Sequence, residues 1–394
     1  MNLAQTALGL RDYIQSWRRR LHQYPELSLQ EVQTTQALAE ELDRLGIPVI
    51  RFPGHTGLIG VIAGSFPGKT VLLRADIDAL PIRENTGLPY AAQNGAMHAC
   101  GHDCHAAMLL GAARLLLEHR EELPGTVRLL FQAAEETSHG AEYFISQGCL
   151  DGVDAAFGIH IWSGLTAPLI SVEAGPRMAA CDNFELVVHG TAAHGASPHL
   201  GCDGIAAAAA AVTALQGYVA RRHDVFQPLV VTIGSIHGGE APNILADTVT
   251  LSGTARCFDE ALRARLQGDL EALFSAACLP YGCTAQLHWH SLAPAVVNHD
   301  PHLVETGRQA ARKLYGPQGL GHLAPLMVSE DFAYYSQHVP TLFCFLGGGN
   351  PEINAIYPHH NECFRIDEDA LPRGAALYAQ FALDYLKGEA AHEA

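Results

Sequence analysis

The feature that most constrains the fold of this sequence is a repeated alternation of apolar strands and helices before residue 182. The segments 56–64 (TGLIGVIAG) and 70–78 (TVLLRADID) are near-continuous apolar runs, as is typical of strands buried on both faces. The elements expected next are a helix at 105–120, a strand at 125–136, a helix at 140–148 and a strand at 155–162. This order predicts an α/β fold with a largely parallel sheet.

The order of elements changes near residue 182. Strands and helices there follow the sequence β-α-β-β-α-β, which is that of a ferredoxin-like α+β domain, and the α/β order resumes after about residue 294. A chain of 394 residues is also too long for one ordinary core. We therefore expect one α/β domain formed by residues 1–181 and 294–394, interrupted by an inserted α+β domain at 182–293.

The start of the chain is expected to form two helices within residues 1–45. Ser28 and Glu31, in SLQE, have the spacing of a capping box for the second helix. The basic run Arg18-Arg19-Arg20 is interpreted as a solvated helix face.

Charge and composition exclude several classes of function. The net charge of −17 repels phosphate backbones and anionic lipid, so we expect no nucleic-acid partner and no membrane-surface binding. The N-terminal residues lack the pattern of a secretory signal, and no apolar run approaches the ~20 residues of a membrane span. The ten cysteines are expected to be reduced thiols, which places the protein in the cytoplasm.

Side chains that bind metals follow the ends of several predicted strands. Ligand sites in open α/β sheets lie at the carboxyl ends of the strands. The residues at these ends are Asp76, Asp78, Glu135, Glu136, His160, His359 and His360, and the segment 97–105 (MHACGHDCH) lies just before a helix. Thiolate, imidazole and carboxylate are the ligands of zinc and its first-row neighbours. The sequence therefore predicts a metal site at this edge.

The spacing within these segments suggests how the roles divide. Cys100 and His102 are two residues apart, so an extended loop can direct both at one centre. Glu135 and Glu136 are adjacent, and adjacent side chains of a strand point opposite ways, so one can bind metal while the other acts as a base.

A thiol nucleophile is the main alternative, with Cys100 paired with His102 or His105. Nearby carboxylates would raise the pKa of such a thiol, which weighs against this alternative. Cys104 is interpreted as a small buried residue. Asp76 either orients a ligand histidine or caps a loop. We expect His105, His199 and His359 to be supporting residues.

Taken together, the motifs of this chain resemble the co-catalytic metal amidohydrolases, which include aminoacylases, hippurate hydrolases and plant auxin-conjugate hydrolases. The resemblance covers nearly the whole chain. The matching segments are HQYPELSLQE (22–31), LRADIDALPIRENTGLPY (73–90), MHACGHDCH, FQAAEE (131–136), GIH (158–160), HGTAAHGASPH (189–199), APNILAD (241–247), GTARCFDE (253–260), SEDFAYY (329–335) and HHNECFRIDED (359–369).

The resemblance implies a role for each matching residue of the α/β domain. Cys100 would bridge two divalent metal ions. His102 and His160 would complete one site, and Glu136 and His360 the other. Glu135 would be the general base.

The resemblance also implies that the inserted domain is a lid and dimerisation domain, so we expect a homodimer. His194 would reach a neighbouring subunit's site and hold the developing oxyanion. Asn243 and Arg256 would contact the substrate, Arg256 through the substrate's carboxylate. Glu330 matches an acid beside the site.

The chain departs from the family's usual pattern at positions that are not predicted ligands. The family usually has Gly or Ala at the position of Cys104, in the motif GHDGH or GHDAH. Proline is usual at the positions of Ala133 and Glu362. The segment before His194, Thr191-Ala192-Ala193, is usually rich in glycine. These departures concern substrate preference.

The expected function is hydrolysis of N-acyl amino acids by metal-activated water, with Glu135 as general base. A cysteine ligand disfavours magnesium and calcium, and we expect zinc, manganese, cobalt or nickel. One alternative is a dipeptidase or carboxypeptidase with the same metals. Another is a non-catalytic metal-binding protein, against which the presence of Glu135 weighs, since Glu135 is not itself a predicted ligand.

Overall fold

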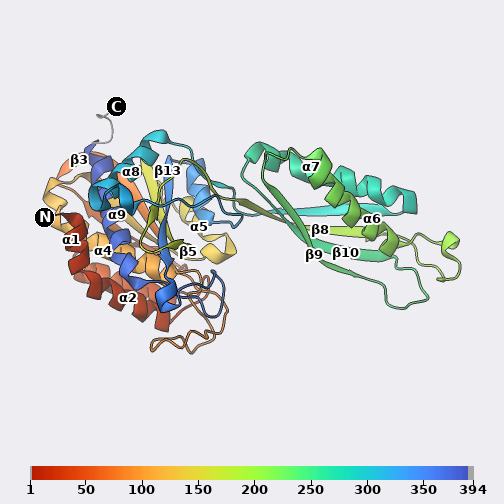
Figure 1. Cartoon of the computed structure of the whole chain (residues 1–394), viewed down its shortest axis with the longest axis horizontal. Coiled ribbons are helices and arrows are strands. Elements are labelled where there is room, and N and C mark those ends of the chain that lie inside the picture. The colour runs from red at the N-terminus through yellow and green to blue at the C-terminus, as the bar shows by residue number, and fades with distance from the viewer. Residues whose placement is uncertain (1, 389–394) are drawn as a thin grey trace. The chain divides into compact units, whose positions relative to one another are not determined.

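The computed structural model describes residues 2–388 (Figure 1). The chain divides into two compact units: Met1–Gly175 with Val297–Ala324 and Asp331–Ala394, and Pro176–Val296 with Pro325–Glu330. The expected bounds of the inserted domain, 182–293, stay a prediction. Among the described residues, every helix is too short or too polar to cross a membrane.

A seven-stranded sheet in the order β1-β2-β4-β3-β5-β13-β6 forms the centre of the first unit. Its strands are β1 (Val49–Arg51), β2 (Leu58–Ala63), β3 (Phe66–Asp76), β4 (Pro124–Gln132), β5 (Ala155–Thr166), β6 (Ile170–Ser171) and β13 (Thr341–Gly349). The α/β class is confirmed, but only the four central strands are parallel. β1, β2 and β6 join antiparallel. Only Gly64 and Ser65 separate β2 from β3, and a parallel arrangement needs a long crossover.

The helices of the first unit are α1 (Leu3–Gly9), α2 (Arg11–Gln23), α3 (Val32–Arg44), α4 (His102–Glu118), α5 (Gly140–Ser146), α8 (Pro301–Tyr315) and α9 (Leu371–Lys387). Helix α4 is rich in alanine and leucine and is buried around most of its circumference. It packs against β3, α9 and α2. Figure 1 shows α4 in the layer of helices beside the sheet. The first residue of α4, His102, is thereby fixed at the carboxyl edge of the central strands.

The start of the chain differs from the expectation of two helices. α1 and α2 are separate helices that meet at Leu10, and α3 is a third. The predicted capping box is wrong, because the Ser28 hydroxyl donates to Asp78 at 2.7 Å. The carboxylate of Glu26 instead accepts the N–H groups of Gln33 and Thr34, at 3.1 and 2.8 Å, in the first turn of α3. The contacts of Ser28 and Glu26 depend on the tertiary fold, so the spacing of residues within SLQE does not reveal them.

The prediction that Arg18 lies on a solvated face is also wrong. Arg18 is 1% exposed, and its Nε donates to the carboxylate of Asp103 at 2.8 Å. Arg19 and Arg20 are exposed as expected. Arg18 faces inward because α2 packs on α4, where Asp103 supplies the opposite charge that a buried guanidinium requires.

The second unit contains β8 (Ala180–His189), α6 (Gly204–Gly217), β9 (Leu229–Gly238), β10 (Thr248–Cys257), α7 (Glu260–Cys278) and β11 (Thr284–Ser291). This is the β-α-β-β-α-β order expected from the sequence. The strands form an antiparallel sheet in the order β11-β8-β10-β9, and both helices lie on one face of it (Figure 1). Leu186, Leu251, Leu266 and Phe274 belong to its buried core. A separate two-stranded sheet pairs β7 (Gly175–Met178) with β12 (Val296–Asn298).

Candidate metal centre

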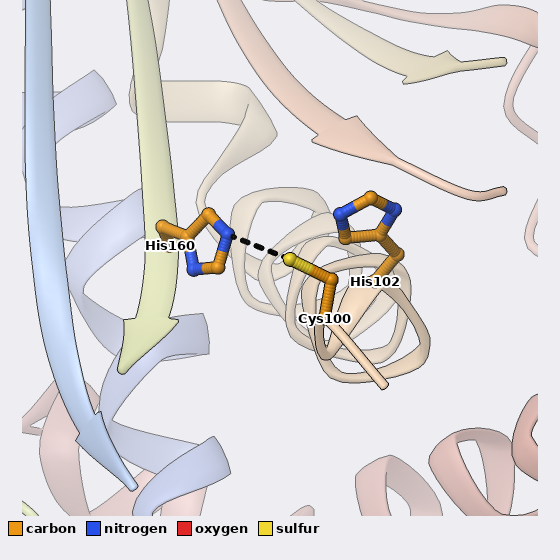
Figure 2. A group of neighbouring side chains, drawn as sticks. All are labelled: Cys100, His102 and His160. Carbon is orange, nitrogen blue, oxygen red and sulfur yellow. Dashed lines mark hydrogen bonds between the residues drawn. The ribbon is translucent and has the colours of Figure 1, made fainter. Parts of the chain in front are cut away.

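Five of the predicted site residues lie together in the first unit. The ligand atoms of Cys100, His102 and His160 are all within 4.8 Å of one another, and so are those of Cys100, Glu136 and His360. Cys100 belongs to both groups. Its Sγ points at Nε2 of His160, 3.6 Å away, while His102 projects from the start of α4 (Figure 2). The structure thus brings together the two sets that the sequence predicts as two metal sites, and their role as ligands stays a prediction.

Gly101 sets the directions of the two side chains that flank it. Its φ of 92° lies in the left-handed region, and a Cβ at this position would meet Ile161 Cγ2 at 2.6 Å. A glycine is therefore required here, both for the backbone conformation and for the close approach of β5. The turn at Gly101 allows Cys100 to stay in the loop while His102 begins α4.

The ring of His102 is oriented by Asp78. Its Nδ1 lies 2.9 Å from the carbonyl oxygen of Asp78 and 3.1 Å from the Asp78 carboxylate. Both atoms are acceptors, so Nδ1 carries the proton and donates it. Nε2 of His102 is buried and has no hydrogen-bond partner among residues 2–388. A buried nitrogen with no hydrogen-bond partner among the described residues, beside a thiol and carboxylates, fits a divalent cation of the zinc type once its proton has left.

The charge state of His102 follows from its neighbours. Burial lowers the pKa of the imidazole, but the carboxylates of Asp76 and Asp78 outweigh burial and hold this pKa well above its usual range. Binding of a cation at Nε2 would therefore release a proton.

His160 is held in the neutral form that binds metals. Its Nδ1 donates to the carbonyl oxygen of Ile161 at 2.6 Å, which leaves the Nε2 lone pair directed at Cys100. Burial, with the rings of His105 and His359 nearby, keeps the pKa of His160 well below its usual range.

The Cys100 thiol is poorly suited to be a nucleophile on its own. Burial and the carboxylate of Glu136 raise its pKa well above the usual range. A protonated thiol is a weak nucleophile, which weighs against the thiol alternative. A cation bound at the sulfur would reverse this effect and deprotonate the thiol.

The two acidic residues lie on a tight turn and not along a strand, so that part of the sequence interpretation is wrong. β4 ends at Gln132, and Glu135–Thr137 form a 3-10 helix. The N–H of Glu136 donates to the Asp78 carboxylate at 2.9 Å. Oε1 of Glu135 accepts the N–H of Asp331 at 3.3 Å. Glu136 groups with Cys100 and His360, and both acids also group with His102.

Some supporting residues are not those that the sequence predicts. Asp78 orients His102, whereas Asp76 binds Nδ1 of His105. Asp76 and Asp78 are two residues apart at the end of one strand, so alternation does not distinguish them. His105 and His359 are supporting residues as expected: Nε2 of His105 accepts the N–H of Ile161 at 2.9 Å, and Nε2 of His359 accepts that of Ser163 at 3.2 Å.

Asp331 was missed entirely, although it lies in the SEDFAYY segment that carries the resemblance. It is fully buried, and its carboxylate accepts hydrogen bonds from Arg74 at 2.7 Å and Gln132 at 2.8 Å. These contacts hold the backbone N–H that binds Glu135.

The three remaining predicted site residues belong to the second unit. His194 is exposed, and its Nδ1 accepts the N–H of Ala196 at 3.0 Å. Asn243 lies beside this segment, because its carbonyl oxygen accepts the N–H of Gly195 at 2.7 Å. Arg256 is half-buried on β10 and donates to the carbonyl oxygen of Met327 at 3.3 Å. The roles of these residues stay predictions. Glu330 is buried in this unit, and His199 is exposed.

Comparison with known proteins places this geometry in a family. Residues 72–384 match the pattern of "Peptidase family M20/M25/M40". The chain is 39% identical to "Thermostable carboxypeptidase 1" of Saccharolobus solfataricus, over 95% of this chain and 96% of that protein. It is 41% identical to "N-acetyl-L-cysteine deacetylase" of Bacillus subtilis, over 90% and 83%. A Bacillus subtilis crystal structure described as "a Dinuclear Metal Binding Peptidase from M20 Family" superposes with a TM-score of 0.85 at 34% identity, over 96% and 99%.

Proposed function

The chain belongs to peptidase family M20/M25/M40 and is a metal-dependent hydrolase of amides, and on that premise we propose that its substrates are N-acyl amino acids. The observation that supports a two-metal mechanism most directly is the pair of ligand groups that share Cys100, one of which includes the buried Nε2 of His102, without a hydrogen-bond partner among the described residues. The similarity to a deacetylase of an N-acetyl amino acid supports the substrate class.

In this proposal, Cys100, His102 and His160 hold one cation, and Cys100, Glu136 and His360 hold the other. We propose that the ions are zinc, manganese, cobalt or nickel, which when bound would supply a Lewis acid and lower the pKa of a water molecule. The outer contacts already present, from Asp78 to His102 and from Ile161 to His160, fix the ring nitrogen that each histidine offers.

Glu135 is the general base of the proposed reaction. Its carboxylate removes a proton from the attacking water and later delivers it to the leaving amine. The N–H of Asp331 donates a hydrogen bond to Oε1 of Glu135, which helps to hold this carboxylate in place for the transfer. Nothing in this role requires Glu135 to bind a cation itself.

The second unit supplies the proposed substrate contacts. His194 donates to the developing oxyanion, reaching the site of a neighbouring subunit in a homodimer. Arg256 binds the carboxylate of the amino acid, and Asn243 contacts the substrate beside it. The exposure of His194 and Asn243 is consistent with this role.

A second candidate function is a carboxypeptidase that uses the same ligand groups. The similarity to "Thermostable carboxypeptidase 1" supports this candidate over almost the whole chain. The two functions differ only in whether the acyl group of the substrate bears a free amine.

The experiment that separates these functions measures the free amino acid released from N-acetyl amino acids, N-benzoyl amino acids and dipeptides, before and after chelation. Chelator-sensitive release from N-acyl amino acids is expected, whereas release from dipeptides alone would favour the carboxypeptidase. Glu135→Gln should keep the metal content and lower turnover by about 10²- to 10⁴-fold. Turnover that persists in this variant would show that Glu135 is not the base.

A further inference from the structure

The turn that carries Glu135 and Glu136 is held by two buried carboxylates. The N–H of Ala134 donates to Oε1 of Glu31 at 2.9 Å, and the N–H of Glu136 donates to Oδ2 of Asp78 at 2.9 Å. Asp78 already has a role, because it orients His102. Glu31 comes from a distant part of the chain, immediately before α3, and neither the ligand groups nor the proposed reaction accounts for it.

The backbone of this turn needs to be held in place. Ala134 has φ 60° and ψ 38°, and Ser138, at the other end of the 3-10 helix, has φ 58°. Residues with a Cβ rarely adopt this left-handed conformation, which persists only where the surroundings enforce it. The N–H of Ala134 also lies in a buried residue, where loss of its acceptor would leave a polar group unpaired. The hydrogen bond to Glu31 meets both requirements.

Glu31 itself is fixed at both carboxyl oxygens. Its residue is 0% exposed, and its Oε2 accepts the hydroxyl of Thr56 at 2.5 Å. Thr56 is followed by Gly57, whose N–H donates to Oγ1 of Thr35 at 2.8 Å. Burial raises the pKa of Glu31 to about 7. Burying a carboxyl group costs free energy, and ordinary core packing does not require one here. The buried carboxyl group of Glu31 therefore points to a specific role in holding the backbone N–H of Ala134.

We propose that Glu31 is a positioning residue that acts through the backbone of Ala134 to fix the direction of the Glu135 carboxylate. The proposal rests on the proposed function, in which Glu135 moves the proton. Without Glu31, the turn at Ala134 relaxes from its left-handed conformation, and Glu135 leaves the position in which the N–H of Asp331 meets its Oε1 at 3.3 Å. Glu136 is still held by Asp78 in that case, so the metal ligands should remain in place.

The test uses three variants of the full, metal-loaded protein. Glu31→Ala removes the acceptor of the Ala134 N–H. Glu31→Gln keeps an oxygen for that N–H, and its amide can donate to the Thr56 hydroxyl. Thr35→Val is the matched control: it removes from α3 the acceptor of the buried Gly57 N–H and keeps the hydrogen bonds that Glu31 and Asp78 accept from the turn.

Steady-state kinetics on the preferred substrate should separate these variants. We expect Glu31→Ala to lower kcat by about 10- to 100-fold, as displacement of a reacting group by about 1 Å does, with KM and metal content close to wild type. Glu31→Gln should restore kcat to within a few-fold of wild type. Thr35→Val should lose thermal stability and keep kcat. If Glu31→Ala fails to fold, Glu31→Asp, which is too short to reach Ala134 and Thr56 together, should show the same loss of kcat.

Amide hydrogen exchange gives a readout that does not depend on activity. Exchange of the amides of residues 134–137 should become faster in Glu31→Ala and remain as in wild type in Thr35→Val. The proposal is overturned if kcat of Glu31→Ala matches that of Thr35→Val, if Glu31→Gln is as impaired as Glu31→Ala, or if exchange in the turn is unchanged. A wild-type protein that hydrolyses none of the substrates would instead contradict the proposed function, and exchange alone would then decide whether Glu31 holds the turn.

Discussion

Residues 100–103 contribute to two groups of polar side chains whose pairing differs. In the ligand cluster (Cys100, His102, Glu136, His160 and His360), Nε2 of His102 has no hydrogen-bond partner among the described residues. In the ion-pair cluster (Arg18, His22, Glu84 and Asp103), Asp103 binds Arg18 and His22 at 2.8 Å each, and His22 binds Glu84 at 3.1 Å. Histidine and carboxylate side chains thus take part in two different kinds of site.

The two clusters differ in whether their charged and hydrogen-bonding groups already have partners. The ion-pair cluster pairs two cations, Arg18 and a protonated His22, with the carboxylates of Asp103 and Glu84, and Arg18 also pairs with Glu368 outside the cluster, so its charges are matched without a ligand. The ligand cluster contains a buried nitrogen with no hydrogen-bond partner among the described residues, which is suited to bind an added cation. We infer that Asp103 anchors the motif to α2, while Cys100 and His102 serve the chemistry.

The largest effect should come from the ligand cluster. His102→Ala should weaken metal binding by more than the roughly 10- to 100-fold typical of losing an outer contact, because it removes a ligand atom itself. His22→Gln, a change of the buried histidine in the ion-pair cluster, should leave metal content unchanged. The metal bound per chain after dialysis measures both. Equal loss of metal in the two variants would remove the distinction between the clusters.

The next effect should come from the ion-pair cluster and should appear in stability. Arg18→Met removes one of the two cations that pair with the buried carboxylate of Asp103 and should lower the free energy of unfolding by about 3–5 kcal/mol. Arg20→Met, two residues along the same helix and exposed, should change it by less than about 0.5 kcal/mol. Urea unfolding of both variants makes this comparison. An Arg18 variant as stable as the Arg20 variant would show that the cluster does not anchor α2.

The pH dependence of stability should also report on the ion-pair cluster. Burial and the Arg18 guanidinium lower the pKa of His22, but hydrogen bonds and attraction from Asp103 and Glu84 outweigh them, so this pKa is raised. A raised pKa means that the stabilising charge is fully present below the unfolded value of about 6.5 and is lost as pH rises through the folded value. The free energy of unfolding should therefore fall as pH rises above about 6.5, and His22→Gln should reduce that slope. An unchanged slope in the variant would assign the effect to other groups.

The smallest effect should come from Cys104, where this chain departs from the usual motif. Cys104 is fully buried, and its thiol lies 3.5 Å from Oδ1 of Asp103, on the side of the ion-pair cluster. Cys104→Ala should cost about 1 kcal/mol of stability through lost packing and leave the metal content and substrate preference unchanged. Thermal unfolding and the substrate panel test this. A changed substrate preference would place Cys104 in the chemistry after all.

The fold could be predicted from the sequence where the pattern of apolar residues decides it. Buried runs such as TVLLRADID specify central strands, and the change of order near residue 182 indicates a second architecture. The antiparallel direction of β2 depends on the two-residue link to β3, and the burial of Arg18 depends on which face of α2 meets α4. Neither the direction of β2 nor the burial of Arg18 can be read from a local pattern of apolar and polar residues.

The grouping of the site residues could be predicted because strand ends meet at one edge of the sheet. Cys100, His102 and His160 come from separate elements, yet the rule brings them together. The choice between Asp76 and Asp78 could not be predicted, since it depends on the rotation of α4 about its axis. The support from Glu31 could not be predicted either, because its position in SLQE is equally typical of a helix cap.

The central claim is that the ligand cluster binds cations that are required for amide hydrolysis. The most direct test strips the protein of metal, adds zinc, manganese, cobalt or nickel in steps, and measures both the ions bound per chain and the free amino acid released from an N-acetyl amino acid. We predict no release from the stripped protein and a rate that rises as up to two ions bind each chain. Full activity without bound metal, or no activity on any substrate when both sites are filled, would contradict the claim.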